Sequence, residues 1–344
     1  MKKIFLIAAA VLMALPLFAK VPGCVTVTRD RLLSGEKLMA EEFPRCSKKG
    51  NSLVFIAGVE SFGKLTIGMG FESYRARWIV IDGKGVSLYT REKENTLVES
   101  FEHGVTVKDF IVISIRQRVD GKSDFILQGG GSSFRQVLST TTDMNGCPQV
   151  ICDGTVLSDV RLSCGNADLD KDIWLFGDSY FGINSARWPG YLKDAGYVDG
   201  YYINGLAGQN SKGALDDLRR ALALATPKFL VWCLGMNDPD ERWLTCFEEV
   251  KSICRDKGIC LVLSTVPSVP TRSKELINKT VRESGLRYVD FSEAVGATPD
   301  GTWYEGCLHT DGVHPTPLGA RYLAMRFLAD FPEITLTAYS EGTL

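Results

Sequence analysis

The sequence has few of the residues that metal sites need, and it lacks the charge pattern of a nucleic-acid-binding protein. Its 344 residues include three histidines, His103, His309 and His314. Ten cysteines are present, but none follow a CxxC spacing, so we expect no bound metal. The formal net charge is −2 and basic residues do not cluster, which argues against a nucleic-acid partner.

Long apolar runs are also missing, except at the N-terminus. "MKKIFLIAAAVLMALPLFAK" has two lysines, an uncharged apolar stretch at 4–18 and then Ala19, the layout of a secretory signal peptide over residues 1–19. The stretch is shorter than the about 20 residues of a membrane helix, so no stable membrane span is expected after cleavage. We therefore expect a secreted or periplasmic protein. Lipid anchoring at Cys24 is an alternative that Lys20 and Pro22 disfavour.

The cysteines of an exported chain can form disulfides. Sequence proximity suggests pairing among Cys147, Cys152 and Cys164, and between Cys24 and Cys46. Cys233 and Cys260 lie inside apolar runs and are expected to be buried thiols.

The first part of the chain, residues 24–165, consists of short β-prone runs separated by turn signals. Asp82-Gly83 and Asp120-Gly121 are two such signals, and Ile111, Ile113 and Ile115 alternate with other residues. No long helical period occurs here. This pattern predicts an all-β sandwich domain, jelly-roll-like in type.

After a polar link at 165–172, the pattern of residues 172–332 changes to apolar runs that alternate with helical segments. The apolar runs lie at 173–177, 200–204, 228–235, 259–265 and 286–291. Between the second and the third, Leu215, Leu218 and Leu222 share a helix face, with Ser211 as the expected N-cap and Pro227 as the stop. This alternation predicts a parallel α/β sheet covered on both faces, with ligands at the carboxyl ends of its strands.

Residues suited to acyl transfer stand at these strand ends. Ser179 is the candidate nucleophile, and His314 is the base that would accept its proton. Asp311, three residues earlier, can orient and support the imidazole. The backbone N–H groups of Ser179 and Gly208 and the side-chain amide of Asn237 are candidate donors to an oxyanion.

Each of these motifs also has a simpler interpretation. Gly-Asp-Ser and the segment ending at Gly208 are common in turns, Asn237 and Asp238 can cap a helix, and His314 can be a structural histidine. His103 and His309 are interpreted as surface or structural residues. The order of the motifs after consecutive strands favours the joint catalytic interpretation.

On these motifs the chain resembles the GDSL-type serine esterases of the SGNH hydrolase superfamily. The four blocks of that family correspond to "GDSY", "NGLAG", "GMND" and "DGVHP", and the resemblance covers about 172–332. It implies a flavodoxin-like three-layer α/β/α domain with five parallel strands, and cofactor-free ester hydrolysis. Gln209-Asn210 follows Gly208 where many members have Gly-Asp, which leaves Gly205 as the alternative oxyanion glycine.

A β-sandwich that precedes such a domain resembles secreted carbohydrate esterases, so the first hypothesis is a secreted esterase removing acyl, specifically acetyl, groups from glycans. Trp78 and Tyr89 can stack on sugars or belong to the core, and Trp303 and Tyr304 are candidate pocket walls. A lipid-directed esterase, lysophospholipase or thioesterase is the alternative, disfavoured by the polar "DPDERWLT". An inactive glycan-binding protein is a third. The sequence indicates no oligomeric state.

Overall fold

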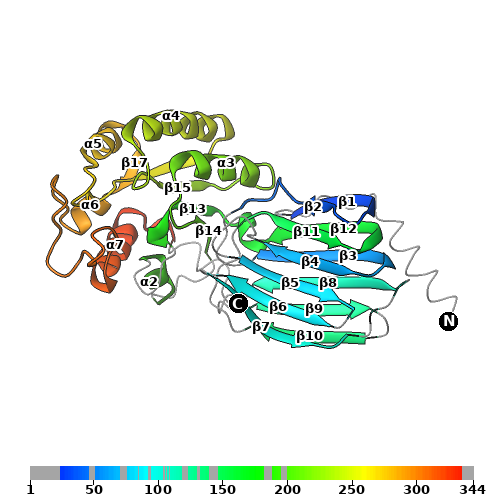
Figure 1. Ribbon diagram of the computed structural model, residues 1–344. Coiled ribbons are helices and arrows are strands. Elements are labelled where there is room, and N and C mark those ends of the chain that lie inside the picture. The colour runs from blue at the N-terminus through cyan, green and yellow to red at the C-terminus, as the bar shows by residue number, and fades with distance from the viewer. Residues whose placement is uncertain are drawn as a thin grey trace, which may run out of the picture.

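The computed structural model shows two regions, one built of strands alone and one of strands and helices (Figure 1). The residues that it describes are 24–45, 51–69, 76–83, 85–91, 94–103, 105, 107, 109–117, 123–129, 132–138, 146–181, 188–194 and 200–334. The expected signal peptide, 1–19, lies outside them, as does Cys46.

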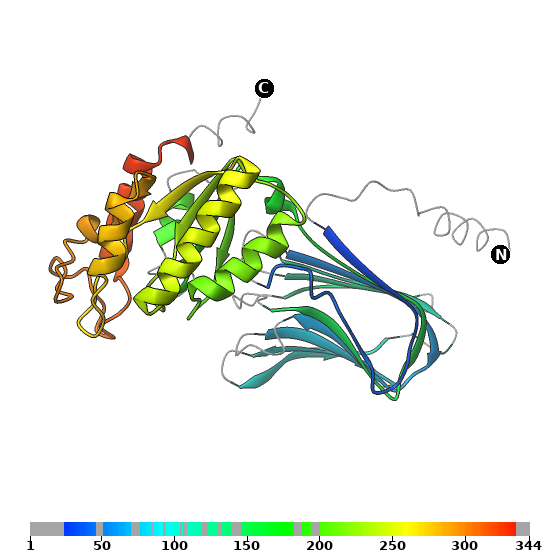
Figure 2. The same cartoon turned by 90° about the horizontal axis from the view of Figure 1, so that it is seen from above.

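The first region contains two six-stranded antiparallel sheets. One sheet has the order β1 (Cys24–Leu32), β12 (Val156–Asn166), β3 (Asn51–Ser61), β8 (Phe110–Gln117), β9 (Ser123–Gly129) and β10 (Ser132–Leu138). The other has the order β2 (Lys37–Met39), β11 (Pro148–Asp153), β4 (Lys64–Met69), β5 (Ala76–Asp82), β6 (Val86–Arg91) and β7 (Asn95–Phe101). The two sheets face each other (Figure 2). Side chains such as Phe55 and Ile113 from the first sheet and Ile67 from the second form one hydrophobic core.

The strand order differs from that of a jelly roll. Strands β4 to β7 pair with their neighbours in sequence, and so do β8 to β10, which makes each set a meander. A jelly roll is instead made of two Greek keys, whose long connections place distant strands side by side. The short turn between β5 and β6, where Asp82 N–H donates to the Gly85 carbonyl at 3.0 Å, keeps consecutive strands adjacent.

The link between the regions is structured. Strand β12 runs into the 3-10 helix η1 (Ala167–Asp170), and the Asn166 side chain accepts a hydrogen bond from Asp168 N at 2.8 Å while donating to Asn51 at 3.0 Å. Arg45 N donates to the Asp217 carboxylate at 3.1 Å, and Leu224 packs against both cores. The two regions therefore contact each other directly.

The second region is a five-stranded parallel sheet with the order β14 (Tyr201–Gly205), β13 (Ile173–Gly177), β15 (Phe229–Cys233), β16 (Cys260–Ser264) and β17 (Arg287–Val289). Helices α2 (Trp188–Asp194), α6 (Phe291–Ala294) and α7 (Pro317–Asp330) cover one face, and α3 (Ser211–Leu222), α4 (Asp240–Lys257) and α5 (Glu275–Glu283) cover the other (Figures 1 and 2). The order 2-1-3-4-5 is that of flavodoxin-like sheets, as expected.

Two helix starts lie near the candidate site. Thr316 caps α7, and Pro317 occupies the first turn of that helix. The prediction for α3 was off by one residue, because Asn210 is the N-cap and accepts from Gly213 N at 3.0 Å. Ser211 is instead a buried helical residue whose backbone N–H and hydroxyl donate to the Asp238 carboxylate.

The cysteine predictions are partly wrong. Cys152 and Cys164 are free thiols, each buried on its strand, and the Cys24–Cys46 pairing includes a residue outside the described ranges. Cys233 is buried as expected, and that burial raises the pKa of its thiol to about 12. Cys260 is exposed because it begins β16 at the amino-terminal rim of the sheet.

Candidate active site

Ser179 lies where β13 ends and the 3-10 turn η2 (Ser179–Phe181) begins. Asp178 closes this turn, because its carboxylate accepts from Tyr180 N at 3.0 Å and its carbonyl accepts from Phe181 N at 3.1 Å. The Phe181 ring then covers the strand end so closely that a Cβ on Gly177 would lie 1.9 Å from it. A glycine at this position leaves room for the Phe181 ring beside the nucleophile.

His314 lies on a short hairpin that precedes α7. His309 N donates to the His314 carbonyl at 2.9 Å, Gly312 N donates to the His309 carbonyl at 2.9 Å, and Leu308 forms a β-bridge with Pro315. Gly312 has φ +71°, the left-handed conformation that favours glycine. The hairpin is anchored to the start of α7, so the imidazole is held at the rim of the sheet.

The structure brings Ser179, His314 and Asp311 into one hydrogen-bonded chain. His314 Nε2 lies 2.9 Å from Ser179 Oγ, and His314 Nδ1 lies 2.8 Å from Asp311 Oδ2. The other Asp311 oxygen accepts from the backbone N–H groups of Val313 and His314, both at 2.9 Å. Burial alone raises the pKa of Asp311, but these hydrogen bonds outweigh it and hold the pKa well below its usual range. The carboxylate is therefore ionised at neutral pH.

The other two histidines have different surroundings. His309 is 54% exposed, and its Nδ1 accepts from Asp311 N at 3.2 Å. It is thus a neighbour of the triad aspartate that the sequence did not indicate. His103 bonds to the backbone of Asp82 and Val105, which is a structural role in the β region.

Two glycines were candidates for the oxyanion position, and their geometries differ. Gly208 is exposed in the loop after β14 with φ +77°, and its backbone N–H has no acceptor among the described residues. Gly205 is buried within β14, and a Cβ there would lie 2.5 Å from the Phe181 Cβ. Gly205 therefore serves packing, whereas Gly208 offers a free donor.

Asn237 lies in the loop after β15, beside the Gly208 loop. Its Nδ2 donates to the Gln209 carbonyl at 3.0 Å, which ties the two loops together. The neighbouring Asp238 does not cap α4 by a side-chain bond; it accepts from Ser211 instead. Burial raises the pKa of Asp238, and the Ser211 bonds oppose that rise.

Sequence reasoning did not assign two residues that contact these loops. The Tyr180 hydroxyl, buried beside the nucleophile, donates to the Val313 carbonyl at 2.7 Å and so holds the histidine hairpin. Arg272 Nη1 donates to the Met236 carbonyl at 3.3 Å. An aromatic residue directly after the serine was the only signal for Tyr180, and none marked Arg272.

The aromatic residues expected near substrate lie elsewhere. Trp303 is buried, and its Nε1 donates to the Ser268 carbonyl at 2.6 Å, which is a structural contact. Tyr304 lines a hollow of about 360 Å³ against Tyr322 and Met325 of α7. Trp78 and Tyr89 stack on each other with ring centroids 5.4 Å apart, on the outer face of their sheet and not in the core.

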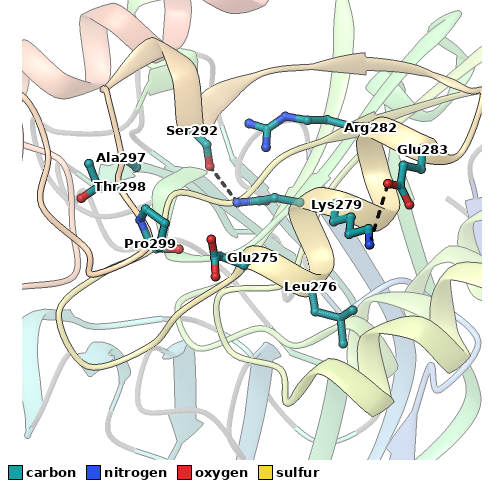
Figure 3. A pocket seen from close by; sticks show the side chains of 11 residues that line it. Glu275, Leu276, Lys279, Arg282, Glu283, Ser292, Ala297, Thr298 and Pro299 are labelled. Atoms are coloured by element: carbon teal, nitrogen blue, oxygen red, sulfur yellow. Dashed lines mark hydrogen bonds and ion pairs between the residues drawn. The ribbon is translucent and has the colours of Figure 1, made fainter.

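A larger cavity, of about 640 Å³, lies beside α5 and is lined by residues such as Lys279, Arg282 and Thr298 (Figure 3). Three of its charged side chains are paired within the protein, since Lys279 faces Glu283 at 4.0 Å and Arg282 binds Asp290, and Glu275 also lines it. None of the five candidate catalytic residues lines this cavity.

The described residues contain no group of three or more His, Cys, Asp or Glu side chains arranged to hold a metal ion. Over the same ranges, no helix has the length and apolar character required to cross a membrane.

Comparisons with known proteins give structural neighbours that cover about half of the chain. The chain matches no protein-family model and no curated protein sequence. Among solved structures it is similar to TesA (21% identity, TM-score 0.38), with 47% of this chain and 98% of that chain covered. A GDSL-like lipase from Bacteroides thetaiotaomicron is 19% identical with a TM-score of 0.38, and the match covers 48% of this chain and 87% of that chain. The psychrotrophic esterase EstA from Pseudoalteromonas sp. is 16% identical with a TM-score of 0.38, and the match covers 48% of this chain and 100% of that chain. At these scores the likeness assigns no activity to this chain, so a function has to be argued from the geometry of Ser179, His314 and Asp311.

Proposed function

We propose that this chain hydrolyses carboxylic esters through an acyl-enzyme at Ser179. One observation carries the proposal: the hydroxyl, imidazole and carboxylate are joined by contacts of 2.9 and 2.8 Å at the carboxyl end of a parallel sheet. Mixed with an acetate ester, the purified protein is expected to release acid, and the Ser179→Ala variant is expected not to. Absence of hydrolysis between neutral and mildly alkaline pH would overturn the proposal.

The proposed reaction has two halves. Ser179 Oγ attacks the ester carbonyl while its proton passes to His314 Nε2, and the ionised Asp311 supports the imidazolium. Collapse of the tetrahedral intermediate breaks the bond to the alcohol, which leaves with the proton from His314. Water then attacks the acyl-enzyme and gives a proton to His314, and as the bond to Ser179 Oγ breaks His314 passes that proton to the serine oxygen and the acid is released.

The tetrahedral oxygen needs hydrogen-bond donors that are already in place. The N–H groups of Ser179 and Gly208 meet this need, because neither has an acceptor among the described residues. The Asn237 amide is the third donor, and it would have to turn from the Gln209 carbonyl or share its protons with both oxygens. Each such donor contributes about 3 kcal/mol to the transition state in well-studied hydrolases.

We infer a short acyl group, specifically acetyl, carried on a carbohydrate. The segment that follows Asn237, residues 238–245, is polar and continues directly into α4. It therefore offers no extended apolar surface for a long acyl chain. Hydrolysis of p-nitrophenyl acetate is expected to exceed that of the palmitate ester, and acetate release from acetylated glycans would identify the carrier.

A lipid-directed esterase is the second candidate, and one observation favours it. Helix α7, directly after the histidine hairpin, exposes Leu318, Tyr322 and Met325, the last at 65%. Exposed apolar side chains of this kind can contact a lipid surface. Faster turnover of palmitate than of acetate, or activation by lipid vesicles, would favour this candidate over the first.

An inactive glycan-binding protein is the least supported interpretation, since all five catalytic positions are filled. For location, we propose export directed by residues 1–19, with cleavage near Ala19. N-terminal sequencing of the protein recovered outside the cytoplasm would test this, and an intact Met1 would contradict it.

A further inference from the structure

Arg272 lies in a tight turn that follows β16, beside the loop that carries Asn237. Val269 N donates to the Arg272 carbonyl at 3.1 Å, and Arg272 N donates to the Val269 carbonyl at 2.8 Å. The Val269 backbone also packs closely on Gly301, where a Cβ would lie only 2.1 Å away. With Ser268 held by Trp303, the turn is fixed from two sides, so the fold itself sets the position of the arginine.

The guanidinium group stands at the rim of the catalytic site. Its Nη1 is 3.3 Å from the Met236 carbonyl and 3.5 Å from Asn237 Oδ1. It also acts on Tyr180, the residue after the nucleophile: burial raises the pKa of that phenol, Asp178 and Asp311 raise it further, and the positive charge of Arg272 opposes the rise. The side chain is exposed to solvent, so a ligand can reach it.

The charge of Arg272 is not balanced within the described part of the chain. Both of its acceptors are neutral oxygens, and no described carboxylate lies within ion-pair distance. Arg282, from the same connection between β16 and β17, differs because it binds Asp290 through two contacts of 3.0 Å. Lys274 is buried and donates to the Asp238 carbonyl. Arg272 therefore retains its Nε and Nη2 donors for a ligand.

We propose that Arg272 determines specificity by binding a carboxylate of the substrate, so that the preferred ester is an acetyl group on a uronic acid. This rests on the proposed ester hydrolysis and narrows its substrate class. A guanidinium group matches a carboxylate with two parallel hydrogen bonds, and such charge-assisted bonds are stronger than neutral ones. A neutral sugar in the same place would leave these donors to water.

The test compares mono-O-acetylated methyl glucuronosides with the corresponding methyl glucosides, at each ring position, by acetate release. Wild-type kcat/KM is expected to favour the uronic acid by about tenfold or more, mainly through KM. Arg272→Gln should bring the ratio near one, and Arg272→Lys should keep an intermediate preference. Arg255→Gln is the matched control, because this exposed arginine at the far end of α4 contacts only Ser252 and Asp256 among the described side chains. It should leave the ratio unchanged.

The outcomes separate the inference from the function on which it rests. Equal hydrolysis of both sugars, or hydrolysis of p-nitrophenyl acetate alone, overturns the inference and leaves ester hydrolysis standing. An equal fall for both sugars in Arg272→Gln, confined to kcat, would make Arg272 a positioning residue for Asn237 instead. No hydrolysis of any ester overturns both proposals.

A variant that fails to fold does not remove the test. In that case the preference of the wild-type enzyme for the uronic acid is measured against salt, since an ion pair at an exposed site weakens as the screening length falls to about 3 Å at 1 M. A preference that persists undiminished at high salt contradicts the proposed role.

Discussion

The strands of the two regions bury their side chains in different ways. In β3 of the N-terminal region, buried residues such as Leu53, Phe55 and Ala57 alternate with partly exposed ones. In β13 and β14 of the α/β region, every residue is buried, because helices cover both faces of the sheet. A doubly covered sheet leaves no free face for a ligand, so its chemistry lies in the loops at the strand ends. An antiparallel sheet covered on one face keeps its other face available.

The largest expected effect tests whether the chemistry of the α/β region lies in the loops at its strand ends. Ser179→Ala removes the attacking oxygen and should lower kcat for p-nitrophenyl acetate by at least ~10⁴-fold, as loss of the nucleophile does in other serine hydrolases. The matched control is Ser163→Ala on β12, which removes a surface contact with Thr26 at 3.0 Å and should leave activity unchanged. Activity retained in Ser179→Ala would contradict the assignment of the nucleophile.

Asp311→Asn should lower kcat by roughly 10⁴-fold while His314 stays in place, because an amide cannot support the imidazolium in the required tautomer. Asp300→Asn is the control: Asp300 also has a lowered pKa, owing to its bonds with Thr298 and Thr302, but it contacts none of the candidate catalytic residues. Comparable losses in the two variants would show that the carboxylate acts only through the local fold.

The lowered pKa of Asp311 also fixes a pH dependence of stability. The folded pKa lies below the unfolded value of about 3.9, so ionised Asp311 stabilises the fold fully above that value and loses this effect as pH falls through the folded pKa. The difference in the free energy of unfolding between wild type and Asp311→Asn should therefore be constant from about pH 5 to 8 and shrink below about pH 4. Urea titrations at neutral and acidic pH would measure this difference in unfolding free energy. A difference that grows on acidification would contradict the prediction.

An intermediate effect is expected from the oxyanion donors. Asn237→Ala should lower kcat by about 10²- to 10³-fold with little change in KM, because the amide acts on charge that develops in the transition state. Asn95→Ala, at an exposed position of β7, is the matched change in the other region and should have no effect. A rise in KM alone would indicate that Asn237 binds substrate in the ground state.

The sequence allowed more of the α/β region to be predicted than of the β region, and the reason is physical. Motifs that follow parallel strands can be placed from sequence, because the carboxyl ends of these strands meet at one edge of the sheet. Ser179 and His314 are 135 positions apart in the chain, and their side chains lie within hydrogen-bond distance as expected. Strand order in antiparallel sheets depends on which short turns close, and the pattern did not separate meanders from a jelly roll. Tertiary contacts such as Tyr180 to Val313 leave no trace in local sequence.

The smallest expected effect tests the role of the outer face of the sheet that contains β5 and β6. Trp78 stacks on Tyr89 with the ring planes 8° apart, and Arg91 lies over the Trp78 ring at 5.7 Å, so Trp78→Ala should cost about 1 kcal/mol of unfolding free energy, the usual size for an aromatic pair. Hydrolysis of p-nitrophenyl acetate should not change, because the pair belongs to the other region. If the outer face of this sheet binds glycans, KM for a polymeric acetylated substrate rises while KM for the small ester stays constant. A fall in small-ester activity would instead mean that the β region shapes the catalytic loops through the contacts at Arg45 and Leu224.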